Sequence, residues 1–289
     1  MSTQTASTPA AGDYPAARTL EAREANQAST ILLRFGRILF ALSIIGLGVE
    51  HFVFGQFVTG RAPAWPQTLP GQQIWAYLTG LIIVLAGAAM VIGKKGRLAA
   101  FGFALLLFLW ALLRHIPVIA TTEVLSPDYT KAVKALALVG GGLIAAATLG
   151  KSESARFPKV AALANRDGTL LSIGTVCLVV FMVNNGLQHF IYTEFVASLI
   201  PAWFPGDAVF WTYASAFMLF AGAIGMLYRR TAYLAALLTA MMIFAWVWIV
   251  HVPRFFVGIS DQIAVFEAPA MAGIAFMIAA LRRKERVRS

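Results

Sequence analysis

Charged residues and cysteine are scarce in this sequence. Asp, Glu, Lys and Arg make up only 12% of its 289 residues, whereas 59% are hydrophobic. Because a soluble globular chain carries about 25% charged residues, this composition excludes an ordinary soluble domain. The single cysteine, Cys177, excludes a disulfide framework and a CxxC redox relay, since both need paired cysteines.

The hydrophobic residues are gathered in blocks long enough to cross a membrane. A helix needs about 20 residues to span a hydrocarbon core of about 30 Å. Eight blocks near that length occur, at residues 33–55, 74–93, 98–117, 130–149, 169–192, 208–228, 231–253 and 262–281. We therefore expect an all-α fold, that of a polytopic membrane protein with eight transmembrane helices.

The first 30 residues contain no long apolar stretch. They are rich in Ala, Ser and Thr and lack the apolar core of a signal peptide. We expect residues 1–30 to be a flexible cytoplasmic tail, and the first helix to act as an uncleaved signal.

The net charge of +10 suggests nucleic-acid binding at first sight, but the positions of the basic residues argue against it. In an eight-helix arrangement, five of the 23 Lys and Arg residues lie on one side of the membrane: Arg61, Arg114, Lys131, Lys134 and Arg254. All the others lie on the opposite side. The positive-inside rule then places both termini in the cytoplasm and the protein in the cell (inner) membrane. The charge indicates contact with the anionic lipid bilayer, not a nucleic-acid partner.

Two stretches of the chain repeat one another. Residues 48–66 align without a gap on residues 186–204, with eight identities. His51 and Trp65 recur in this alignment as His189 and Trp203. Further matches join Trp75 and Tyr77 with Trp211 and Tyr213, Phe108, Trp110, His115 and Pro117 with Phe244, Trp246, His251 and Pro253, and Asp128 and Gly140 with Asp261 and Gly273.

The repeat divides the chain into two four-helix units, residues 31–150 and 168–282, joined by a cytoplasmic linker (151–167) and followed by a basic cytoplasmic tail (283–289). Since each unit has an even number of spans, we expect parallel, same-orientation repeats related by an axis along the membrane normal. Small residues at 139–142 and 268–273 allow close helix approach in lipid. We expect the fourth and eighth helices at the seam between the units; the alternative is packing within each unit only.

All four histidines occupy matched positions, each toward the non-cytoplasmic end of an odd-numbered helix. Three ionisable residues are expected at a similar depth, where a charge needs a partner, a water-filled cavity or a path to the surface. We expect one polar layer that lines a cavity closed by the two Pro-Ala-Trp segments; the alternative for those segments is an interfacial aromatic belt. The layer comprises His51, His115, His189, His251, Glu50, Lys134 and Glu267, with Trp65 and Trp203 above it.

The charges of this layer differ between the two units. Glu50 and Lys134 form the obvious ion pair of the first unit, but Gln188 and Glu267 stand at the same positions of the second. Glu267 then needs His189, His251, Arg254 or, across the seam, Lys134. The asymmetry makes the second unit the better candidate for chemistry. We expect chemistry at His189, His251, Glu267 and Lys134, and cofactor contacts at His51, His115, Glu50, Trp65 and Trp203.

Several roles remain open for the histidines. They tie helices together through hydrogen bonds, or they ligate the iron of haem b from two helices. A third alternative is a zinc or non-haem iron site of His189, His251 and Glu267, which has the residue types of a two-histidine, one-carboxylate centre. In a fourth, a histidine donates to a quinone or substrate carbonyl.

The motifs resemble those of a known family. Gly-x-x-His-Phe, then Pro-Ala-Trp, then Trp-x-Tyr at the start of the next helix and a basic turn resemble the DoxX/DoxD-like integral membrane proteins, over residues 35–281 and in tandem. Because some members of that family are membrane parts of quinone-linked redox enzymes, the resemblance implies a redox-linked component that interacts with quinone or haem and with a partner subunit. The alternatives are a small-molecule or proton-coupled transporter and a non-catalytic membrane scaffold.

Overall fold

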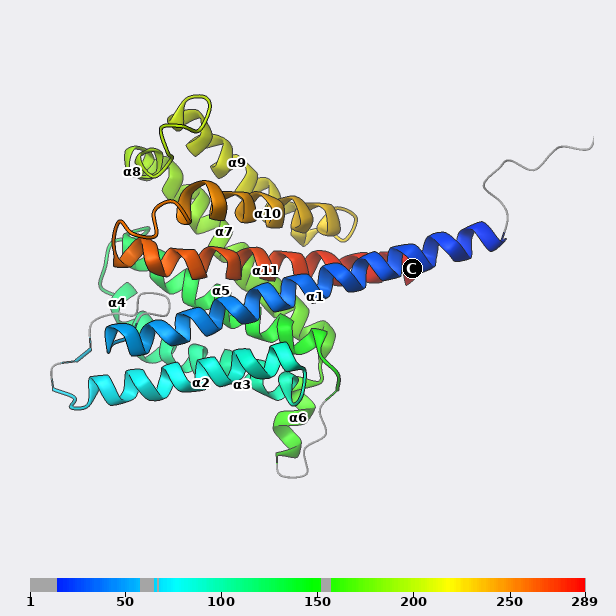
Figure 1. Ribbon diagram of the computed structural model, residues 1–289, viewed down its shortest axis with the longest axis horizontal. Helices are drawn as coiled ribbons and strands as arrows, with labels where there is room; N and C mark the ends of the chain where they lie inside the picture. Colours follow the sequence, from blue (N-terminus) through cyan, green and yellow to red (C-terminus); the bar gives the residue numbers. More distant parts are fainter. Residues whose placement is uncertain (1–14, 58–64, 67, 152–156, 289) are drawn as a thin grey trace, which may run out of the picture.

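The computed structural model describes residues 15–57, 65–66, 68–151 and 157–288, without the side chains of residues 15–22, 287 and 288. Its described part is helical and contains no strand. The long helices are α1 (Pro15–Phe54), α2 (Gln72–Ile92), α3 (Gly96–Trp110), α5 (Pro127–Thr148), α7 (Asp167–Ile191), α9 (Ala208–Leu227), α10 (Ala232–Trp246) and α11 (Ile259–Arg288) (Figure 1). The short helices are α4 (Ile116–Ile119), α6 (Pro158–Ala164) and α8 (Thr193–Ser198).

Eight helical segments in this described part are long and apolar enough to cross a membrane. Two of them join an α-helix to a π-helical segment, α3 to Ala111–His115 and α10 to Val247–His251. The predicted all-α fold with eight spans is therefore confirmed, and the chain is a multi-pass membrane protein by the length and composition of its helices.

The eight helices pack in an order that differs from their order along the chain. The most extensive packing joins α1 to α11 and α5 to α7, and α5 also contacts α11. Helices α5 and α11, the expected fourth and eighth spans, thus lie between the two halves of the chain, as their small faces predict. Figure 1 shows α1 and α11 side by side along much of their length.

Glycines make these two close contacts. A Cβ atom placed on Gly140 of α5 would lie 2.8 Å from the carbonyl oxygen of Gly174 in α7. One placed on Gly273 of α11 would lie 2.7 Å from the carbonyl oxygen of Gly36 in α1. Backbones come this near only when no side chain intervenes, which is how small residues let helices associate in lipid.

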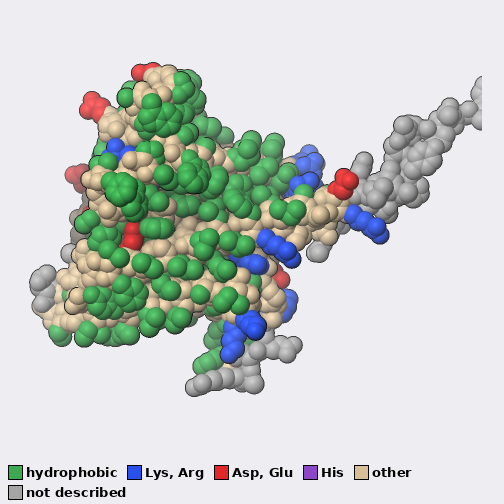
Figure 2. Space-filling model, in the orientation of Figure 1, with side chains coloured by type: hydrophobic (Ala, Val, Ile, Leu, Met, Phe, Trp, Pro, Cys, Tyr) green, Lys and Arg blue, Asp and Glu red, His purple; other side chains and the backbone are tan. Residues whose placement is uncertain are grey.

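Apolar side chains form both the interior and the outside of the bundle. Fully buried side chains such as Phe40, Leu138, Met182 and Ile274 fill the interior. Leu85, Leu105, Ile224, Leu238 and other large apolar residues are exposed on the outer helices, and Figure 2 shows apolar side chains covering much of one face. Such a surface is suited to lipid tails and not to water.

Two segments that the sequence predicted to be tails are helical. Residues 15–30 belong to α1, and residues 283–288 belong to α11; residues 1–14 lie outside the described residues. The prediction underestimated local propensity, because the segment from Pro15 is rich in Ala, Glu and Arg, which favour helix, and Pro is well tolerated in a first helical turn. The predicted linker likewise contains α6.

A buried arginine fixes the geometry of that linker. Arg97, at the start of α3, donates to the carbonyl oxygens of Gly150 (2.9 Å) and Ala164 (2.8 Å), and also to that of Leu149. Its guanidinium also lies 2.6 Å from the Asp167 carboxylate. Arg97 thus joins the ends of α5 and α6 to the start of α7. We call this end of the bundle, where Lys94, Lys95, Arg229 and Arg230 lie, the basic end.

Candidate functional site

Two helices widen into π-helical turns, and each turn ends in a histidine. The amide of Ile116 bonds to the carbonyl oxygen of Ala111, and that of Val252 to Val247 (2.8 Å). A proline follows each histidine by two residues, and its ring would clash with the carbonyl four residues earlier in a regular helix. Turns of this kind are frequent at functional sites. They place His115 and His251 at the end of the bundle opposite the basic end, which we call the histidine end.

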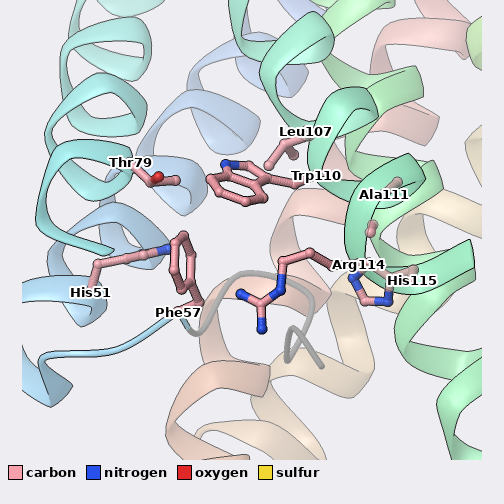
Figure 3. Close-up of a pocket in the computed structure, with 9 residues that line it drawn as sticks. His51, Phe57, Thr79, Leu107, Trp110, Ala111, Arg114 and His115 are labelled. Atoms are coloured by element: carbon pink, nitrogen blue, oxygen red, sulfur yellow. The ribbon is translucent and has the colours of Figure 1, made fainter. Parts of the chain in front are cut away.

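The cavity at the histidine end is formed by the first half of the chain. Its walls are formed by α1, α2, α3 with its π-helical end, and α5. Phe57, which follows α1, completes the lining (Figure 3). Its volume is about 20 Å³, room for a water molecule but not for a large ligand. The lining residues are His51, Phe57, Thr79, Leu107, Trp110, Ala111, Arg114, His115 and Ala135.

Arg114 is the charged group of this cavity. Its side chain is buried at 8% exposure, and its guanidinium carbon lies 4.9 Å from the centre of the Phe57 ring and 5.3 Å from that of Trp65. The Phe57 and Trp65 rings stack on each other at 5.4 Å, and Phe57 meets Trp110 edge to face at 5.0 Å. A guanidinium above aromatic faces is attracted by their quadrupoles, and more so when water is excluded.

The first two histidines both reach this cavity. His51 is fully buried, and its Nδ1 donates to the carbonyl oxygen of Leu47 at 2.7 Å. Because a carbonyl only accepts, the proton of this hydrogen bond belongs to Nδ1. His189 makes the matching bond to Asn185 at 2.7 Å. This part of the arrangement is therefore the same in both halves of the chain.

A buried donor of the cavity lacks an acceptor. The indole N–H of Trp110 is shielded from solvent and has no hydrogen-bond partner among the described residues. Buried donors are nearly always satisfied, by protein or by an ordered molecule. The cavity therefore favours a guest with an acceptor, either a water molecule or a ligand oxygen.

A second polar group lies between α5 and α11. The Lys134 ammonium is 2.7 Å from the Glu267 carboxylate, and the two side chains are 19% and 3% exposed. Among the expected partners of Glu267, the structure thus selects Lys134 across the seam. No ion pair between Lys134 and Glu50 is formed in the described part of the chain, so the predicted pairing of those two residues is replaced.

Only some members of the predicted layer, His51 and His115, line this cavity. Glu50 is buried near His51, whereas Trp203 is 65% exposed and contacts Phe204. The described residues that line the cavity belong to the first half of the chain, so this cavity does not reach His189, His251 or Trp203. His251 ends the π-helical segment that follows α10, and Phe204 contacts Trp246 of α10 at 5.4 Å.

The predicted metal site of His189, His251 and Glu267 is not assembled either. No group of three His, Cys, Asp or Glu side chains within the described residues is arranged to hold a metal ion. The physical reason is the packing of α11, which directs the Glu267 carboxylate to Lys134.

Sequence reasoning missed the central member of the cavity. In the sequence Arg114 serves only as a marker of topology, although an arginine inside an apolar span is itself a functional signal. Trp110 is visible in the sequence only as a residue that the repeat conserves as Trp246. The signal that favoured Arg114 was its place one residue before His115, inside a block of about 20 apolar residues.

One family model matches part of the chain. A domain of unknown function, DUF8561, matches residues 178–278, from within α7 into α11. No curated protein and no solved structure matches the chain. The match lies in the second half, so it does not include the residues that line the cavity. The resemblance to DoxX/DoxD-like proteins stays a prediction.

Proposed function

We propose that the two halves of the chain are parallel repeats of one four-helix unit. Equivalent residues face each other across the seam in support of this arrangement. Lys134 and Glu267, which pair at 2.7 Å, are 133 residues apart, the same separation as Gly140 and Gly273. Gly141 and Ile274 have this separation too, and a Cβ on Gly141 would lie 2.7 Å from the Ile274 side chain.

The two contacts between equivalent residues indicate the direction of the axis that relates the halves. They are seven residues apart along α5, which is about 10 Å along a helix. An axis in the membrane plane would let equivalent residues meet at one depth only. An axis along the helices lets them meet at both depths, which favours same-orientation units. The basic end then faces the cytoplasm with both termini, in the inner membrane.

We further propose that the cavity beside Arg114 binds a quinone ring in a redox-linked membrane component. The observation that supports this proposal is the position of the Phe57 ring between His51 and Arg114 (Figure 3). A flat ring already lies there, between the His51 ring on one side and the Arg114 guanidinium on the other. A quinone is also a flat ring, with oxygen atoms at opposite ends. In this proposal the quinone displaces the Phe57 ring and occupies the space of that ring together with the small cavity.

The polar groups have complementary roles in this proposal. Arg114 and the Trp110 indole N–H donate to one quinone oxygen, and the His51 ring lies at the opposite edge of the quinone. Trp65 stacks on the ring as it now stacks on Phe57. The chain binds and orients the ring, and a redox partner subunit exchanges the electrons. Arg114 and Trp110 supply donors that suit the carbonyl oxygen of a quinone, which makes quinone the better supported of the two cofactors.

Tryptophan fluorescence tests the quinone proposal. A water-soluble short-chain quinone is titrated into the purified protein, and quenching is compared for Trp110→Phe and its repeat equivalent Trp246→Phe. We expect Trp110→Phe to reduce the amplitude of the saturable quenching, leaving the part due to Trp65, and Trp246→Phe to keep the full amplitude. Arg114→Gln should weaken binding about tenfold, the loss of one or two hydrogen bonds to a charged donor. Arg254→Gln, at a partly exposed ion pair with Asp261, should not; equal effects of the two arginine variants would contradict the proposal.

A proton-coupled carrier is the second candidate, because the Lys134–Glu267 pair is buried at the seam. Ionisable pairs inside a membrane protein commonly mark proton or ion pathways. Proteoliposomes with an internal pH dye test this role, with Glu267→Gln as the variant. If neither quinone binding nor proton movement depends on these residues, the chain is a scaffold.

A further inference from the structure

The short helix α6 has a fixed position at the basic end of the bundle. Arg97 donates to the carbonyl oxygen of its last residue, Ala164, and the buried faces of Ala161 and Ala164 pack toward the bundle. Arg97 is 3% exposed and pairs with Asp167 at the start of α7. The position of α6 is therefore set by the same Arg97 contacts that join α5 to α7. We call these contacts the Arg97 clamp.

The other side of α6 is apolar and uncovered. Phe157, Val160 and Leu163 are 55%, 39% and 51% exposed. Their spacing of three residues places them along one face of the helix. Figure 1 shows α6 leaving the side of the bundle across the direction of the long helices, which is the direction of the membrane plane for helices that cross the bilayer. This face therefore meets the bilayer at the depth of the basic end.

Basic side chains border this apolar face. Lys159 in α6 and Arg166 just after it are exposed, and Lys151 lies near the start of the linker with 64% of its side chain exposed. Lys151 is partly used, since it donates to the Asn165 carbonyl oxygen (2.9 Å) and lies 3.6 Å from Asp167. Apolar residues with adjacent cations are the pattern of an interfacial helix that prefers anionic lipid.

We propose that α6 and its basic border form a binding site for anionic phospholipid. The phosphate and head group of the lipid contact Lys159 and Arg166, and its acyl chains lie along Phe157, Val160 and Leu163. Because the Arg97 clamp connects α6 to α5 and α7, the bound lipid touches the linker between the two halves of the chain. This site is independent of the quinone proposal, which concerns the opposite end of the bundle.

Native mass spectrometry of the full-length protein tests the site with two lipids, phosphatidylglycerol and phosphatidylcholine. We expect wild-type protein to bind phosphatidylglycerol more tightly. The double variant Lys159→Glu, Arg166→Glu should bind it roughly ten- to thirtyfold more weakly, from the loss of two cations near the lipid surface. Binding of phosphatidylcholine should stay the same. Unchanged phosphatidylglycerol binding in this variant would overturn the proposal.

A matched control separates a site from general attraction. Arg229 and Arg230 are also exposed at the basic end, in the turn between α9 and α10. Arg229→Glu, Arg230→Glu should leave phosphatidylglycerol affinity within about twofold; a loss equal to that of the α6 variant would mean that charge alone attracts the lipid. Val160→Ser, Leu163→Ser should weaken both lipids at this site, and no effect would exclude acyl-chain contact. Thermal midpoints in detergent verify that each variant is folded.

Discussion

Single buried cations decide much of the geometry at both ends of this bundle. At the basic end, Arg97 satisfies backbone carbonyls from α5 and α6 and the Asp167 carboxylate. At the histidine end, Arg114 lies over aromatic rings. Guanidinium suits both positions, because its planar fork bonds several acceptors at once and also stacks on aromatic faces. An ammonium provides neither geometry.

Replacing Arg97 should therefore destabilise the protein strongly. Arg97→Ala leaves the carbonyl groups of Leu149 and Ala164 without their donor, and we expect a loss of about 3 to 5 kcal/mol, the usual cost of breaking a buried charged network. Arg97→Lys should recover only part of that stability. Thermal unfolding in detergent measures both effects, with exposed Arg230→Gln as the control. If Arg97→Ala lowers stability no more than Arg230→Gln does, the Arg97 contacts do not stabilise the fold.

At the scale of helices, close packing depends on glycines whose register recurs. Gly36 and Gly174 are 138 residues apart, the same separation as His51 and His189. Each of them packs against a glycine in a helix from the other half of the chain. The glycine of α11 meets Gly36, and that of α5 meets Gly174. Two contacts of the same kind then hold α1 to α11 and α5 to α7.

Alanine substitution tests these contacts. Gly140→Ala and Gly273→Ala each place a Cβ within 3 Å of backbone oxygen in the facing helix, so the helices must separate. We expect each to lower stability by about 1 to 3 kcal/mol, the usual cost of overpacking. Gly102→Ala is the matched control, because a Cβ there meets nothing within 4 Å, and it should be neutral or stabilising by up to about 1 kcal/mol. Unfolding midpoints in detergent decide; equal behaviour of the three would refute the packing argument.

The elements were predictable from the sequence where their cause is local. Span lengths follow from bilayer thickness, and the eight apolar blocks agree with the eight long helices. Partners between helices were harder, because they depend on which helices become neighbours. Lys134 was expected to join Glu50, and it joins Glu267 because α5 lies against α11. The proline two residues after His115 and His251 signals a break in the regular α-helical hydrogen bonding. That the break is a π-helical turn follows only from the backbone of the structure.

For the whole molecule, the positive-inside proposal makes a topological prediction. Single cysteines introduced at Lys95 and Thr121, both exposed, report opposite ends of the bundle in a Cys177→Ala background. We expect a membrane-impermeant thiol reagent added to intact cells to label the cysteine at position 121 but not the one at 95. Labelling at position 95 alone would reverse the proposed orientation and place the basic end outside.

The seam between the two halves provides the sharpest test of the repeat. Lys134→Glu places two carboxylates against each other, and Glu267→Lys places two ammonium groups against each other. Each single variant should therefore lower the free energy of unfolding by about 3 to 5 kcal/mol, the cost of an unpaired buried charge. If the halves are related by an axis that passes between these residues, exchanging the two charges reproduces the pair in an equivalent setting. The double variant should then recover most of the loss in thermal unfolding. Lys131→Glu, at a partly exposed i,i+3 pair with Asp128, should have a small effect and is the control. A double variant as unstable as either single one would show that the surroundings of Lys134 and Glu267 differ, and the pair would then owe its geometry to other neighbours and not to symmetry.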